Sequence, residues 1–299
     1  MDFATDHNPV HIIVLGSLES WYVKDLRRAA AGRHIITPHT FRGLASNLSP
    51  SSLDVLSGDG ELLSADAVLV RTMPPGSLEQ VVFRMDALGR LHEAGLVVVN
   101  PPRAIETAVD KYLATAKLRA AGLDVPPTWC GQLADDALRA FAQLGGDVVV
   151  KPLFGGEGRG ITRISDPALA ERAFRMLEQL GAVIYLQPFI EHEGFDLRLL
   201  VVGRRVLGIR RRSATDWRTN VSRGAVAEPL EVTEPLVELA RRAADAVGAP
   251  LAGVDLLPAK DGRLYALEVN GVPGWQAVAR TWNIDVADLV LKLLESCCG

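Results

Sequence analysis

The chain has 299 residues, 48% of them hydrophobic, and a net charge of −4 at pH 7. Its length allows a large core and two or three subdomains, and its acidic balance excludes a chain-wide basic surface for nucleic acid. The three cysteines are not a disulfide framework, and no His or Cys cluster has zinc spacing. Because there is neither a signal-peptide pattern nor an apolar run long enough to span a bilayer, we expect a cytoplasmic protein without membrane or nucleic-acid partners.

Strands and helices alternate over about the first hundred residues. Apolar runs predict strands at 11–16, 35–38, 65–70 and 96–100, with helices predicted at 21–31 and 78–94. This alternation is typical of a parallel α/β unit. Gly16 follows the first strand, but the further glycines of a dinucleotide-binding loop are absent, so we expect an ordinary strand-to-helix turn.

Arg71 directly follows the third of these strands. Parallel α/β units bind ligands at the carboxyl edge of their sheet, so Arg71 is a candidate for binding the carboxylate of a substrate. The alternative is a loop arginine that forms an ion pair on the surface.

The remaining elements follow Pro101-Pro102. Helices are predicted at 107–122, 134–144, 167–180, 235–247 and 284–294, and strands at 148–151, 161–164, 183–190, 196–202 and 206–209. The last of these strands runs into Arg210-Arg211-Arg212. Three interpretations of this arginine-rich stretch are a nucleic-acid contact, solvated strand ends and an anion-binding wall. The acidic net charge favours solvated strand ends over nucleic acid.

A glycine-rich segment, GGEGRG at 155–160, lies between two of these strands. Glycine lets the backbone approach a ligand and point its N–H groups at phosphate oxygens, whereas the alternative is a mobile surface turn. Lys151 ends the preceding apolar strand, where a lysine needs an anionic partner or a route to water. The segment is neither a Walker A nor a Rossmann loop, since no Gly-Lys-Ser/Thr follows and the next element is a strand.

A second hairpin carries two acids. Asp261-Gly262 predicts a two-residue turn, and counting back from it places Asp255 opposite Glu268, with Asn270 on the same face. Opposed carboxylates repel, so a cation is the simplest compensation, and two carboxylates with an amide oxygen suit Mg²⁺. The alternative is an exposed hairpin with solvated acids, but apolar residues flank each acid.

In this order, these features resemble the ATP-grasp fold and, over nearly the whole chain, the RimK-type α-L-glutamate ligases. The most specific segments are VVVKPLFGGEGRG, GFDLRLLVVG, RRSATDWRTNVSRGA, AGVDLL and LEVNGVPG. The resemblance implies an α/β (α+β) ATP-grasp fold. It places a Rossmann-like pre-ATP-grasp domain at 1–106, a central and lid subdomain at 107–186, and a C-terminal subdomain with the magnesium site at 187–299.

The resemblance also implies a role for each matching residue. The residues it assigns to ATP are Lys111, Lys151, Gly155, Gly156, Glu157, Gly158, Gln187, Phe189, Ile190, Asp196, Arg218, Thr219 and Asn220. It assigns Mg²⁺, or Mn²⁺ in its place, to Asp255, Glu268 and Asn270. It also implies that Arg198 and Arg212 face the transferred phosphate or the acyl phosphate. Family members usually have Glu next to the linker glutamine, where this chain has Pro188, which puts ATP affinity or nucleotide preference in doubt.

The expected reaction adds L-glutamate to a carboxylate through an acyl phosphate and releases ADP and phosphate. The segments RTMPPGSLEQ, FRMDAL, NPPRAIE and DKY resemble the branch that acts on tetrahydromethanopterin. Alternatives are the branch that modifies the tail of a small-subunit ribosomal protein and a non-catalytic ATP-binding module. The expected partners are small molecules, namely ATP, L-glutamate and the acceptor. The sequence does not decide whether the protein forms a homo-oligomer.

Overall fold

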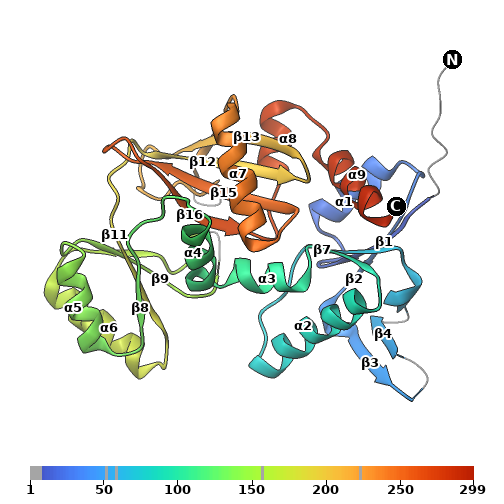
Figure 1. Ribbon diagram of the computed structural model, residues 1–299, viewed down its shortest axis with the longest axis horizontal. Coiled ribbons are helices and arrows are strands. Elements are labelled where there is room, and N and C mark those ends of the chain that lie inside the picture. The colour runs from blue at the N-terminus through green and yellow to red at the C-terminus, as the bar shows by residue number, and fades with distance from the viewer. Residues whose placement is uncertain (1–8, 51–52, 58–59, 156–157, 222–223) are drawn as a thin grey trace. The chain divides into compact units, whose positions relative to one another are not determined.

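The computed structural model describes residues 9–50, 53–57, 60–155, 158–221 and 224–299. They form two compact units (Figure 1). The first comprises Met1–Ile105, Gly248–Leu251 and Val272–Gly299, and the second comprises Glu106–Val247 and Ala252–Gly271. The chain therefore leaves the first unit and returns to it near its end. Helices in the described ranges are too short or too polar to traverse a bilayer.

The described part of the first unit is built on a four-stranded parallel sheet in the order β2-β1-β6-β7. Its strands are β1 His11–Leu15, β2 Ile35–His39, β6 Ala67–Val70 and β7 Val97–Val99. Its helices are α1 Trp21–Ala30, α2 Leu78–Glu93, α8 Gln276–Trp282 and α9 Val286–Cys298. The four strands predicted between residues 11 and 100 are present, each to within two residues at its ends. Helix α1 packs against α9 (Figure 1), so the end of the chain completes this unit.

A small antiparallel sheet of the first unit is missing from the predictions. It consists of β3 Leu44–Leu48, β4 Leu53–Ser57 and β5 Gly60–Glu61. Its strands have two to five residues, and Ser, Asn and Asp interrupt the apolar residues of LASNL and LDVLS, so the local preference for strand is weak.

A helix break at Asp110 divides the segment predicted as one helix over 107–122. The chain instead forms α3 Pro102–Val109 and α4 Lys111–Ala120. Asp110 has an extended backbone, and its carboxylate accepts a hydrogen bond of 3.0 Å from a backbone N–H in the first turn of α4. The single-helix prediction was wrong, because it missed this cap.

The second unit holds an antiparallel sheet in the order β10-β9-β11-β8. Its strands are β8 Trp129–Gly131, β9 Val148–Lys151, β10 Thr162–Ile164 and β11 Ile184–Pro188. Helices α5 Ala134–Gln143 and α6 Pro167–Gln179 pack together, with the rings of Phe141 and Phe174 6.4 Å apart. This packing encloses an apolar core beside the sheet.

A second sheet of this unit has, in the described residues, five strands in the order β14-β13-β12-β15-β16. They are β12 Phe195–Val202, β13 Arg205–Arg212, β14 Val226–Pro229, β15 Leu251–Pro258 and β16 Leu264–Asn270. Helix α7 Glu234–Val247 packs against β12, β13 and β16 (Figure 1). Strand β13 is longer than predicted and contains the arginine run, and β14 was not predicted.

The β15–β16 hairpin reaches its register in an unexpected way. The loop comprises 260–262, because the backbone N–H of Ala259 donates to the carbonyl of Arg263 at 2.9 Å, so the predicted two-residue turn was wrong. A β-bulge next to Asp255 adds one residue on β16 and offsets the extra loop residue. Asp255 therefore lies directly opposite Glu268, as predicted.

Candidate active site

A pocket within the second unit collects most of the residues that the resemblance assigns to ATP. Its walls come from β9, β11, β12, β13, β15, β16 and the loop that follows β13. The predicted residues that line it are Lys151, Gln187, Phe189, Ile190, Asp196, Arg218, Thr219, Asn220, Asp255 and Glu268. Both sheets of the unit therefore contribute to one site.

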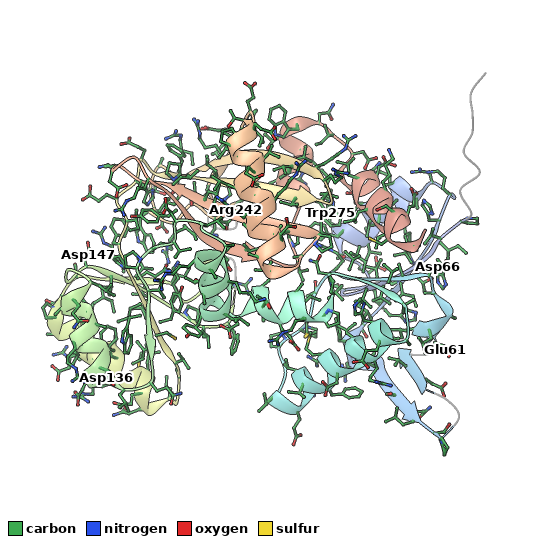
Figure 2. The ribbon with its side chains drawn as sticks, viewed as in Figure 1. Glu61, Asp66, Asp136, Asp147, Arg242 and Trp275 are labelled. Carbon is green, nitrogen blue, oxygen red and sulfur yellow. The ribbon has the colours of Figure 1, made fainter. Side chains whose placement is uncertain are left out.

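The lining also contains apolar and aromatic side chains. The apolar members are Pro126, Val149, Ile161, Pro188, Leu257 and Leu267. Phe189 meets Trp217 edge to face, with 5.7 Å between ring centroids, and the Arg163 guanidinium lies 3.5 Å from the Phe189 centroid. Asp147 (Figure 2) accepts from Arg163 at 2.8 Å and fixes that guanidinium. Flat rings in an apolar wall suit a planar base such as adenine.

Two lysines reach the polar part of the site. The Lys151 ammonium donates to Gln187 Oε1 at 2.7 Å, and burial lowers the pKa of Lys151 to about 8 although Glu268 opposes the shift. Lys111, in the first turn of α4, donates to the carbonyl of Gly155 at 2.5 Å, and its Nζ lies 3.9 Å from a carboxylate oxygen of Glu268. Two desolvated ammonium groups favour an anion, as phosphates would supply.

Four buried charges form a cluster on neighbouring strands β13, β12 and β15. Arg211 holds both oxygens of Asp196, at 2.7 and 2.5 Å, and also lies 3.0 Å from Asp255. Arg198 donates to the other oxygen of Asp255 at 2.7 Å. Burial alone would raise the pKa of Asp255, but the two arginines hold it below its ordinary value, whereas burial raises the pKa of Asp196 despite Arg211. The two acids differ because Asp255 has two cationic partners.

Gly253 explains how Arg198 fits beside its strand. A Cβ at this position would lie 2.4 Å from Cζ of Arg198, so a side chain would displace the guanidinium. Glycine in β15 therefore leaves the space that Arg198 needs to reach Asp255.

The expected magnesium ligands provide only oxygen donors. Asp255 and Glu268 are opposite each other, and Asn270 pairs with Gly253 two residues along the same ladder. Among the described residues no group of three or more His, Cys, Asp and Glu side chains gathers to hold a metal. Two carboxylates and an amide suit Mg²⁺ rather than a transition metal, so the donor set fits the expected ion.

Arg212 does not line this pocket, although the resemblance turns it toward the phosphate. Its Nε lies 3.4 Å from Glu228, its guanidinium covers the ring of Phe195, and 41% of its side chain is exposed. The preceding arginine, Arg211, faces the pocket instead. Sequence reasoning missed Arg211, because its place opposite Asp196 depends on a turn at Gly203-Arg204 that pairs Val202 with Arg205.

The glycine-rich segment is described in part. Gly155 accepts from Lys111, and Gly158 has φ 70°, a conformation that favours glycine. Gly156 and Glu157 lie outside the described residues, so their predicted role in the lid stays a prediction. His192 and Trp217 line the pocket and were not predicted.

Arg71 lies in the first unit, buried between two aromatic rings. Its Cζ is 4.5 Å from the ring centroid of Tyr22 and 4.2 Å from that of Trp275 (Figure 2). One N–H donates to the carbonyl of Pro273 at 2.8 Å, whereas Nε and Nη1 have no hydrogen-bond partner among the described residues. Burial lowers the pKa of Arg71 to about 10. The surface ion pair that was its alternative reading is therefore not present in this structure.

Comparisons with known proteins agree with this geometry. A family model described as RimK-like ATP-grasp domain matches residues 108–294. The tetrahydromethanopterin:α-L-glutamate ligase of Methanosarcina acetivorans is 33% identical over 282 residues, covering 85% of this chain and 87% of the relative. A probable α-L-glutamate ligase of Enterobacter sp. is 33% identical over 253 residues, covering 83% of each chain.

Solved structures show the same fold. The ATP-grasp ligase PsnB complexed with minimal precursor matches with a TM-score of 0.76 and 23% identity, over 97% of this chain and 99% of that one. The RimK domain protein ATP-grasp from Sphaerobacter thermophilus matches with a TM-score of 0.73 and 24% identity, over 95% and 98%. The predicted ATP-grasp fold is confirmed, and fold and pocket together define an ATP-dependent ligase. More particularly, the chain belongs to the RimK-like ATP-grasp family.

Proposed function

We propose that the protein joins L-glutamate to a carboxylate acceptor by way of an acyl phosphate, with ATP and Mg²⁺. The observation that carries the proposal is a pocket lined by Lys151, Arg211, two opposed acids and an aromatic wall. Lys111 lies 3.9 Å from one of these acids, Glu268, and Arg198 lies 2.7 Å from the other, Asp255. Charge neutralisation and positioning are what phosphoryl transfer requires of a protein.

Each group has a role in this scheme. Lys111 and Lys151 hold the phosphates of ATP, and Arg198 and Arg211 stabilise the charge that develops on the transferred phosphoryl group. Mg²⁺, when bound by Asp255 with its partners, supplies further charge neutralisation. No nucleophilic side chain is needed, because the acceptor carboxylate attacks the phosphorus and the amine of glutamate then attacks the acyl carbon.

The proposed acceptor is a tetrahydromethanopterin-type molecule with a free carboxylate. The support is the similarity to the relative of that name, which extends over both units of the chain. The test incubates the protein with Mg-ATP and L-glutamate and offers either a tetrahydropterin with a terminal carboxylate or a ribosomal-tail peptide ending in Glu. A glutamyl adduct of the pterin, read by mass, supports this acceptor. An adduct of the peptide alone contradicts it, and ADP with neither adduct leaves a ligase for another carboxylate.

We further propose that Arg71 binds a carboxylate of the acceptor. A buried guanidinium without a carboxylate partner is costly, and Nε and Nη1 of Arg71 have no hydrogen-bond partner among the described residues, so an acceptor carboxylate would supply both charge and acceptors. Arg71→Met should raise KM for the acceptor about 30-fold or more and leave ATP affinity unchanged. Arg84→Met is the matched control, because Arg84 is also a buried arginine of this unit, held by the carbonyl of Pro74 at 2.7 Å. Equal effects of the two variants would contradict the assignment.

A further inference from the structure

A chain of hydrogen bonds, buried at Gln187 and Tyr185, leads away from Lys151 within the second unit. Lys151 donates to Gln187 Oε1 at 2.7 Å, and Gln187 Nε2 donates to the hydroxyls of Thr128 at 3.0 Å and Tyr185 at 2.9 Å. Gln187 and Tyr185 are 2% and 1% exposed. Tyr185 and Lys151 are also direct partners on β11 and β9. Tyr185 is not part of the pocket lining and acts only through its neighbours.

Chemistry fixes the direction of each bond. An ammonium only donates, so Lys151 must meet the amide oxygen of Gln187. Thr128 donates to the carbonyl of Pro126 at 2.8 Å and therefore accepts from Gln187. The Tyr185 hydroxyl shares its other bond with Thr115 at 2.8 Å and keeps a lone pair for the amide.

The two hydroxyls thereby lock one orientation of the amide. Both N–H groups of Gln187 are used, and its oxygen faces Lys151. If the amide were flipped, an N–H would face the ammonium, and both donors would leave their hydroxyl acceptors. Loss of one hydroxyl leaves an amide N–H without its acceptor, which is unfavourable and removes the preference for the observed orientation.

We propose that Tyr185 is a positioning residue, which through Gln187 sets where Lys151 meets the phosphates of the bound nucleotide. This rests on the proposed role of Lys151 toward ATP. It differs from the expected contact of Gln187 with adenine, because both amide N–H groups of Gln187 bond Thr128 and Tyr185, which do not line the pocket.

The test measures the Kd of a non-hydrolysable Mg-ATP analogue by calorimetry, so that no acceptor is needed. Tyr185→Phe and Gln187→Met should each weaken binding about five- to twentyfold, which is the loss expected for one buried hydrogen bond. In the Gln187→Met background, Tyr185→Phe should add no further loss, because the amide it orients is gone. Tyr265→Phe is the matched control, another buried tyrosine of the same unit, and should bind as the wild type does.

Three outcomes overturn the proposal. If Tyr185→Phe binds the ATP analogue with wild-type affinity, the proposal is wrong. If Tyr185→Phe weakens binding equally in the wild-type and Gln187→Met backgrounds, Tyr185 has a packing role. A wild-type protein that does not bind the analogue, or a Lys151→Met variant that binds it as tightly as the wild type, removes the premise as well. If Tyr185→Phe melts at a temperature far below that of the wild type, Thr128→Val is measured in the same way, because it removes the other hydroxyl that accepts from Gln187. Absent ligase activity with intact analogue binding would instead count against the proposed function alone.

Discussion

Arg211 and Arg212 are adjacent in β13 but face opposite sides of the sheet. Arg211 bridges two buried acids in the pocket, whereas Arg212 meets a half-exposed Glu228. Arg211→Met should therefore reduce turnover about 100-fold or more and destabilise the fold by about 3–5 kcal/mol, because Asp196 and Asp255 lose their shared partner.

Arg212→Met is the matched control, with the same change one residue away. It should change stability by no more than about 0.5–1 kcal/mol and turnover by less than about threefold, since exposed ion pairs contribute little. Urea unfolding and steady-state rates measure both. If Arg212→Met lost most of its turnover while Arg211→Met stayed active, Arg212 rather than Arg211 would be the residue that acts on the transferred phosphate.

Lys151 predicts a pH dependence of nucleotide binding. Burial lowers its pKa to about 8 from an ordinary value of 10.5, so the free protein loses this positive charge as the pH rises through about 8. Affinity for the ATP analogue should then fall between about pH 8 and 10, and Lys151→Arg should flatten that decline, because arginine keeps its charge. Calorimetry across this range measures the effect, and an affinity that is flat up to pH 10 would contradict it.

At the scale of elements, the β15–β16 hairpin depends on its loop glycine. Gly262 has φ 85°, a conformation that costs other residues about 1–2 kcal/mol. Gly262→Ala should lower the free energy of unfolding by about that amount. Gly89→Ala in α2, where an added Cβ meets nothing within 4 Å, should raise it by about 0.5–1 kcal/mol. If Gly262→Ala were as stable as the wild type, the left-handed loop would be wrong.

The same hairpin shows what the sequence could predict. Alternation and the position of Asp261-Gly262 placed Asp255 opposite Glu268, yet the loop holds one more residue and a bulge restores the register. Loop length and bulge position depend on tertiary packing, which local preference does not contain. The prediction missed one extra residue in the loop and one extra residue in the bulge of β16, and these two errors cancelled. The two acids therefore face each other because of a bulge that the counting did not include.

Strand periodicity predicted the parallel sheet and most of the second unit, because buried strands carry continuous apolar runs. It missed the break before Lys111, where a capping aspartate outweighs helical spacing, and the short strands β3 and β4. Strand position and counting indicated Asp255, Glu268, Asn270, Lys151 and Arg71, and the other site residues came from resemblance. Arg211, which pairs with Asp196 across β12 and β13, needed a register that only the structure supplied.

At the scale of the whole molecule, the two units carry different parts of the proposed chemistry. The second unit holds the nucleotide pocket, and the first holds the buried Arg71. The final segment of the chain returns to the first unit, where Asp285 accepts two hydrogen bonds of 2.8 Å from Arg28. Nucleotide binding and acceptor binding should therefore respond to separate substitutions.

The central claim is that the acceptor carboxylate attacks ATP before the amine reacts. The most direct measurement uses an acceptor whose carboxylate carries a heavy oxygen isotope, together with Mg-ATP and L-glutamate, and follows the released phosphate by mass. An acyl phosphate passes one carboxylate oxygen to phosphate, so the account predicts labelled phosphate in step with glutamyl product. Unlabelled phosphate from a reaction that forms the same product would contradict it.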